Sequence, residues 1–152
     1  MRPTSSKTAG SSEKDADPSR KKVYRWEDDW PGWNKNTLSL RSCRAVIVSA
    51  CHAYDVAPPA VRQHGDGLSW SEPEDENVIS FQSKSRRPGN GGKNLPVALH
   101  EAAHHIVFHL HGKRVQDHGP TFMRVYLDLL TRFRVAPRLA LEVTARKWGL
   151  RW

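Results

Sequence analysis

The sequence has 152 residues, of which 24 are Lys or Arg and 16 are Asp or Glu, giving a formal net charge of +8. This length suits one domain with a single hydrophobic core. No apolar run approaches the length of a membrane span, and the N-terminus lacks the apolar region of a secretory signal. We therefore expect a cytoplasmic protein with no membrane partner.

Positive charge gathers in two parts of the chain. Residues 83–93 hold four Lys or Arg and no acid, and residues 131–152 hold six basic residues with Glu142 as the single acid. Such segments are usually solvated surface, but an excess of this kind also favours nucleic acid as a partner.

Residues 1–22 are rich in Ser, Lys, Asp and Pro without apolar periodicity, which predicts a disordered basic tail. Residues 23–152 are then the folded domain. The domain opens with an aromatic segment, VYRWEDDWPGW at residues 23–33, whose rings we expect to pack on the core.

The first helix is expected over residues 37–54, where apolar residues recur at three- and four-residue spacing. Asn36 or Thr37 can cap its start. Cys43 and Cys51 lie eight residues apart in it, which is too far along a helix for a disulfide. We interpret both cysteines as small buried apolar residues, a usage that suits a reducing compartment.

The middle of the chain reads as strands and loops. Short strands are expected at residues 60–64 and 68–71, and the clearest strand runs from Asn77 to Gln82. The acidic residues 72–76 and the basic, Gly-rich residues 87–94 predict loops.

The last third of the chain predicts three helices. Asn94 can cap the first, Pro96 lies in its first turn, and Gly112 can end it. The second begins at Pro120. The third begins after Pro137, with Leu139, Val143 and Trp148 as its apolar face and Gly149 as its stop.

The first of these helices carries the sequence HEAAH, from His100 to His104. Residues four apart lie on one face of a helix, so both imidazoles can bind one metal ion. Glu101 is rotated from His100 by about 100°, so its carboxylate can reach a water on the metal and act as the base. Alone, the pattern is only moderately specific, and an ordinary histidine-rich surface is the alternative.

A third metal ligand must come from elsewhere. His105 and His109 miss the face that carries His100 and His104, given the helical period. His111 lies on that face but about 10 Å along the axis at 1.5 Å per residue. We favour His118, because it opens the next helix after a loop that lets the chain return, and His111 stays as the alternative. Three protein ligands leave the fourth position of a Zn²⁺ ion open, as in catalytic sites.

Three further residues near the motif could assist the site. Asp117 and Asp128 could each orient an imidazole, although a helix cap and a solvated face are their simpler roles. Tyr126 could donate a hydrogen bond to a developing oxyanion, and core packing is its simpler role.

HExxH followed by the run His-Gly-Pro-x-Phe at residues 118–122 resembles the zincin core of the SprT and Spartan-like metalloproteases. The resemblance implies His100, His104 and His118 as zinc ligands and Glu101 as the base. A small group of uncharacterised metallohydrolases of bacteria and phages is more similar still, because they share a Val-Tyr-x-x-Glu-like segment, here Val23 to Glu27. That likeness covers roughly residues 22–152.

The resemblance implies an α+β, minimal zincin-like fold, with a small, mostly antiparallel sheet packed on the HExxH helix and further helices. Residues 77–82 are then the edge strand to which a substrate peptide could add. Spartan-like enzymes depend on DNA, but this chain lacks a recognisable C-terminal zinc module with cysteine ligands.

We therefore expect a zinc-dependent metallopeptidase that acts on a protein or peptide substrate. A zinc hydrolase of another amide or ester is one alternative. Another is a DNA-associated or phage regulatory protein whose zinc site is structural or inactive, but a purely structural site has no need of Glu101.

Overall fold

The structure is a computed structural model, and it describes residues 17–31, 36–64, 70–71, 77–82 and 92–152. Within these ranges the chain forms an α+β fold of five helices and one small sheet. The elements are, in order, α1 (Arg20–Asp28), α2 (Leu40–His52), β1 (Ala60–His64), β2 (Trp70–Ser71), β3 (Val78–Gln82), α3 (Leu95–His111), α4 (Pro120–Arg132) and α5 (Arg138–Lys147).

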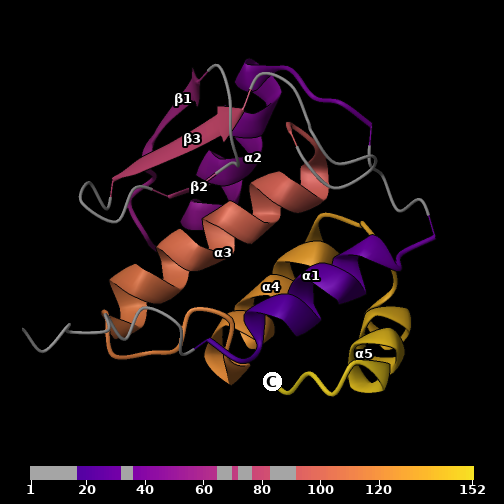
Figure 1. Cartoon of the computed structure of the whole chain (residues 1–152). Helices are drawn as coiled ribbons and strands as arrows, with labels where there is room; N and C mark the ends of the chain where they lie inside the picture. The colour runs from indigo at the N-terminus through magenta and orange to yellow at the C-terminus, as the bar shows by residue number, and fades with distance from the viewer. Residues whose placement is uncertain (1–16, 32–35, 65–69, 72–76, 83–91) are drawn as a thin grey trace, which may run out of the picture.

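Helix α3 crosses the middle of the molecule (Figure 1). The sheet and α2 lie on one side of α3, and α1, α4 and α5 lie on the other. Among the described residues, no helix combines the length and apolar character needed to cross a bilayer.

Helix α1 corrects the expected domain boundary. Residues 1–16 of the expected tail lie outside the described residues, but α1 begins at Arg20, inside that tail. Val23, Trp26 and Trp30 are buried, as expected for the aromatic segment, and they repeat at spacings of three and four. Residues 20–28 therefore form an amphipathic helix, and the fold includes residues that we had assigned to the tail. Trp33 of the aromatic segment lies outside the described residues.

Helix α2 is shorter than expected. It begins at Leu40, and its cap is Ser39, whose Oγ accepts a hydrogen bond of 3.0 Å from the backbone N–H of Ser42. Asn36 and Thr37 are therefore not its caps. Cys43 and Cys51 are both buried and free, which confirms their expected role.

The sheet has the order β1-β3-β2. The longer pairing, from Ala60–Val78 to His64–Gln82, is parallel, and β2 adds two antiparallel residue pairs. The expectation of a mostly antiparallel sheet was therefore wrong. The chain between residues 64 and 78 is long enough to return to the same end of the sheet, which a parallel pair requires.

Strand β3 lies in the centre of the sheet, so the expectation that residues 77–82 form its edge was also wrong. Four consecutive residues, from Val78 to Phe81, are buried. A strand covered on both faces has no reason to alternate apolar and polar residues, so the sequence of β3 need not alternate strictly.

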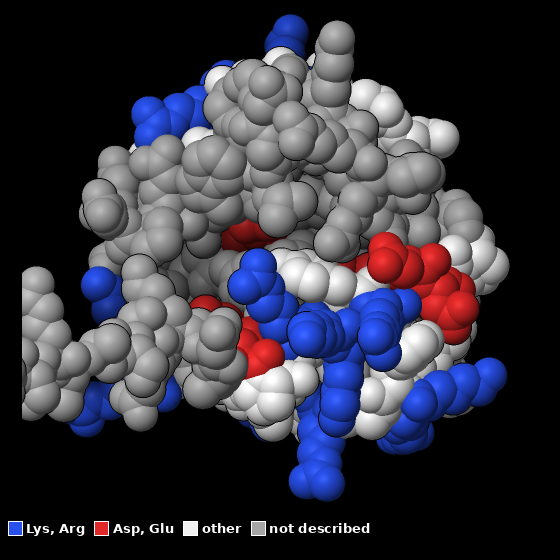
Figure 2. Space-filling view, viewed as in Figure 1, with Lys and Arg blue, Asp and Glu red and all other residues white. Residues whose placement is uncertain are grey.

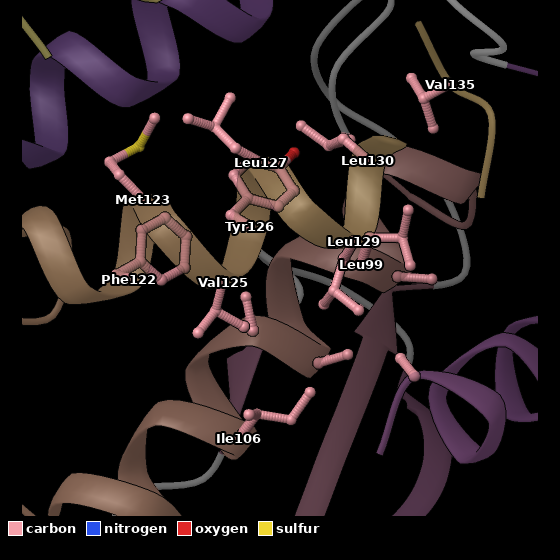
Figure 3. Packing of buried hydrophobic residues seen from close by; sticks show 14 of the residues in the cluster. Leu99, Ile106, Phe122, Met123, Val125, Tyr126, Leu127, Leu129, Leu130 and Val135 are labelled. Atoms are coloured by element: carbon pink, nitrogen blue, oxygen red, sulfur yellow. The ribbon is translucent and has the colours of Figure 1, made fainter. Parts of the chain in front are cut away.

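The core lies mainly between α3 and α4 (Figure 3). Leu99 and Ile106 of α3 face Phe122, Val125 and further residues of α4. These residues, together with Ala102, Ala103, Met123, Tyr126, Leu127, Leu129 and Leu130, are buried in one cluster. Leu110, in the last turn of α3, is 48% exposed, because it lies where the helix leaves the core.

Helix α5 has the expected position but not the expected buried face. Leu139 and Val143 are 69% and 46% exposed, whereas Leu141 and Ala145 are buried. The hydroxyl of Thr144 accepts a hydrogen bond of 2.9 Å from Nε1 of Trp26, so α5 turns this side toward α1. Helix α5 in this orientation packs against both α4 and α1.

Candidate metal centre

Helix α3 places His100 and His104 one turn apart beside the core. Its first turn is fixed by Asn94, whose Oδ1 accepts a hydrogen bond of 2.9 Å from the backbone N–H of Val97. Pro96 follows in the first turn, as expected. Since Ala102, Ala103 and Ile106 anchor the helix, the two imidazoles occupy a fixed position.

The chain returns to the site between α3 and α4. Gly112 ends α3 with a φ of 73°, a left-handed conformation that favours glycine. A Cβ at Gly119 would lie 3.0 Å from the Cβ of Gln116, so the turn before Pro120 also needs the smallest residue. These two positions bring His118 back to His100 and His104.

The three imidazoles converge through their Nε2 atoms. The Nε2 atom of His104 lies 3.1 Å from that of His100 and 3.2 Å from that of His118, and the third separation is 3.3 Å. In a tetrahedral zinc site with Zn–N bonds of about 2.0–2.1 Å, ligand nitrogens lie about 3.3–3.4 Å apart. The observed triangle fits such an ion, and the three histidines could hold a metal.

Two carboxylates from the N-terminal part of the chain contact the Nδ1 atoms of two of these three rings. Nδ1 of His100 lies 2.7 Å from Oε1 of Glu27, and Nδ1 of His118 lies 2.5 Å from Oδ2 of Asp17. A carboxylate accepts the Nδ1 proton, so the Nε2 lone pair of the neutral ring is free to bind a metal. The arrangement is the carboxylate–histidine pair typical of metal ligands.

The electrostatics of the three rings also suit a cation. Burial and the nearby His100 lower the pKa values of His104 and His118, which favours their neutral, metal-binding forms. Burial also lowers the pKa of His100, but the charge and hydrogen bond of Glu27 outweigh it, and the pKa is raised overall. The charge of Glu27 therefore favours positive charge at His100.

Glu101 lies beside the histidines and is 7% exposed. Its charge contributes to the raised pKa values of His100 and of Tyr24, both of which are in the same site. The structure therefore places this carboxylate near His100 and Tyr24.

Aromatic side chains enclose the three rings. Tyr24 stacks on His100 with ring centroids 5.7 Å apart and lies edge-on to His118 at 5.5 Å. Phe122 stacks on His104 at 4.4 Å. Burial first, and then the charge of Glu101, raises the pKa of the Tyr24 hydroxyl, which therefore stays protonated near neutral pH.

The other histidines of α3 and the following loop lie outside this triangle. His105 is buried on another side of the helix, where its Nε2–H donates a 2.8 Å hydrogen bond to the carbonyl of Ala57. His109 packs against His105 with centroids 4.3 Å apart, and His111 is exposed. His118, and not the alternative His111, is the third member of the cluster.

The expected supporting residues have other contacts. Asp128 accepts hydrogen bonds from Tyr54 and Arg132, and Asp117 is exposed. Tyr126 is fully buried, and its hydroxyl donates to Oε1 of Glu27 at 2.7 Å, which directs it away from an oxyanion. Burial, and then the charge of Glu27, raise the pKa of the Tyr126 hydroxyl well above its ordinary value.

Sequence reasoning missed Asp17 and Glu27 as partners of the ligands. The available signal was the segment from Val23 to Glu27, where Tyr24 and Glu27 lie three residues apart and reach one side of a helix. No protein-family model, curated protein or solved structure matches this chain.

Proposed function

We propose that this protein is a zinc-dependent metallopeptidase with His100, His104 and His118 as its metal ligands. The observation that carries the proposal is the convergence of the three Nε2 atoms, 3.1–3.3 Å apart, beside a buried glutamate. The HExxH and HGPxF patterns, which resemble those of SprT and Spartan-like metalloproteases, support the same function.

Zinc is the metal that suits this set of ligands best. Neutral imidazole is a borderline ligand that zinc accepts readily, and three such ligands are typical of catalytic zinc. When bound, zinc supplies an open position that polarises a substrate carbonyl and makes a water molecule acidic near neutral pH.

Glu101 is the proposed general base. One of its carboxylate oxygens accepts a proton from the attacking water and then donates it to the departing amine nitrogen, so the residue is regenerated. Its burial strengthens its interaction with nearby positive charge, because little water screens it. Glu27 and Asp17 meanwhile hold the ligand rings, and Tyr24 and Phe122 restrict water around them.

The deciding experiment compares the native protein with Glu101→Gln after both are loaded with zinc. We expect one zinc per chain in each protein and a loss of peptide hydrolysis by about two to four orders of magnitude in the variant. Asp55→Asn, an exposed position after α2, is the matched control and should keep full activity. Hydrolysis that persists in zinc-loaded Glu101→Gln would show that another group is the base.

One observation favours a second candidate, a DNA-associated protein whose zinc site is structural or inactive. Arg20, Lys21, Lys22 and Arg25 of α1 are exposed, and Figure 2 shows Lys and Arg gathered on the face where Figure 1 places α1. A salt-dependent gel shift that Glu101→Gln leaves unchanged, without any hydrolysis by the native protein, would support it.

A further inference from the structure

Helix α1 is poorly suited to exist on its own. It has nine residues, and no side chain caps its first turn. Its basic residues Arg20, Lys21 and Lys22 lie at the N-terminal end and its acidic residues Glu27 and Asp28 at the C-terminal end. This order opposes the helix dipole, which favours acids at the start and bases at the end. The helix therefore depends on what it docks against.

Two kinds of contact dock α1. Val23, Trp26 and Trp30 are buried, and Nε1 of Trp26 donates to Oγ1 of Thr144 on α5. Further contacts lie at the metal centre, where Asp17 and Glu27 accept hydrogen bonds from the rings of His118 and His100. Some of the groups that hold residues 17–30 in place therefore also shape the metal site.

We propose that residues 17–30, here called the α1 clasp, and the metal stabilise each other. Asp17 and Glu27 are positioning residues, which fix the Nδ1 atoms of two ligands and so direct both Nε2 atoms to one point. Three Nε2 atoms held 3.1–3.3 Å apart direct their polar atoms at one point, where a cation could bind all three. Because the coupling is reciprocal, a metal that binds more tightly when the clasp is docked must also stabilise the docked clasp.

The inference rests on metal binding at the three histidines but not on peptidase activity. Trypsin provides a direct readout, because Arg20, Lys21, Lys22 and Arg25 are exposed cleavage positions within the clasp. Cleavage of a folded helix requires local opening, so its rate follows the stability of the docked state. We expect saturating zinc to slow cleavage in the clasp by roughly tenfold or more relative to the metal-free protein.

Arg41 and Arg44 on α2 are the internal control for this experiment. Both are exposed, and α2 does not contribute a histidine or a carboxylate to the metal centre. Zinc should leave their cleavage rates within about twofold if it acts on the clasp rather than on global stability. Equal protection of the two regions would overturn the proposal, because it would show general stabilisation.

Two conservative variants test the positioning residues. Glu27→Gln and Asp17→Asn keep the size of each side chain and an acceptor oxygen but remove the charge. We expect each to weaken zinc affinity by about 10- to 100-fold, as for other partners of metal-bound histidines, and to lose the zinc protection of the clasp at a fixed metal concentration. Asp55→Asn removes the same charge from an exposed position outside the clasp and should change neither quantity.

A cobalt titration separates positioning from a loss of folding. With Co²⁺ in the site, visible absorption reports the ligand geometry, and we expect it to change in Glu27→Gln while the far-ultraviolet circular dichroism stays native. His104→Ala removes a ligand that neither carboxylate touches, so zinc should no longer protect its clasp.

The proposal is overturned if the native protein binds one zinc and its clasp is cleaved equally fast with and without the metal. It is also overturned if Glu27→Gln and Asp17→Asn bind zinc as tightly as the native protein. Failure of the peptidase assignment would look different, because zinc would bind and protect the clasp while no peptide was cut.

Discussion

Oε1 of Glu27 lies 2.7 Å from Nδ1 of His100, although the two residues are 73 positions apart in the chain. The same oxygen accepts a second hydrogen bond of 2.7 Å from the hydroxyl of Tyr126. Helices α1, α3 and α4 therefore meet at one carboxylate oxygen. The orientation of a proposed metal ligand depends on a residue that does not touch the metal.

The hydroxyl of Tyr126 should affect zinc affinity through its hydrogen bond to Glu27. We expect Tyr126→Phe to keep the ring packing, to lower the free energy of unfolding by about 1.5–3 kcal/mol because a bond to a charged group is lost, and to weaken zinc affinity by roughly tenfold at most. Urea unfolding and a zinc competition titration measure the two effects.

Tyr54→Phe is the matched control, since the hydroxyl of Tyr54 donates to Asp128 at 2.6 Å, away from the site. It should lower stability and leave zinc affinity unchanged, and an equal loss of zinc affinity in both variants would contradict the prediction.

The choice of His118 over His111 can be tested by substituting each with alanine. His118→Ala removes one Nε2 atom from the triangle, so we expect zinc binding at neutral pH to fall below one ion per chain after dialysis. His111 is exposed at the end of α3, and His111→Ala should bind zinc as the native protein does. Atomic absorption gives the metal content. Loss of zinc in His111→Ala alone would reverse the assignment.

The cluster of His100, His104 and His118 was predictable because its geometry is mostly local. His100 and His104 follow the helical period, and Gly112 marks where the chain turns back toward His118. The partners of these rings were not predictable in the same way. Asp17 lies 101 residues from His118, and only the folded arrangement of α1 brings them together.

The elements that were predicted least well depend on their neighbours. The buried side of α5 packs against both α4 and α1, and Leu139 was expected on that side but is exposed. Strand β3 was expected at an edge, whereas pairing partners on both sides make it central. Periodicity identifies an amphipathic element, but it does not say which neighbour the apolar side will meet.

The start of α2 offers a test of local capping. Ser39→Ala removes the oxygen that accepts the N–H of Ser42, so we expect a loss of about 1 kcal/mol in the free energy of unfolding. Asn36, the cap expected from the sequence, is exposed outside the helix, and Asn36→Ala should change stability by less than about 0.5 kcal/mol. Urea denaturation of the two variants compares them directly, and a larger loss in Asn36→Ala would place the cap elsewhere.

The cysteines of α2 predict a pH dependence of both reactivity and stability. Burial raises the pKa of Cys43 and of Cys51 to about 11. The folded pKa exceeds that of a free thiol, so this contribution to stability is fully present below about pH 8.5 and is lost as the pH rises through about 11. Iodoacetamide at pH 8 should label the native protein at least about 100-fold more slowly than the urea-unfolded protein, because few thiolates form. Rapid labelling of the native state at pH 8 would show that a thiol is accessible and ionised.

Removal of the metal should lower stability by an amount that the binding constant fixes. A ligand that binds only the folded state adds about 2.7 kcal/mol when its free concentration is 100 times Kd. We therefore expect zinc at that excess to raise the free energy of unfolding by this amount and a chelator to abolish the gain. His104→Ala should show no such gain, since it lacks one of the three Nε2 atoms. Chemical denaturation with and without zinc measures the difference. A gain of the same size in His104→Ala would mean that zinc stabilises the protein from a site other than the three histidines.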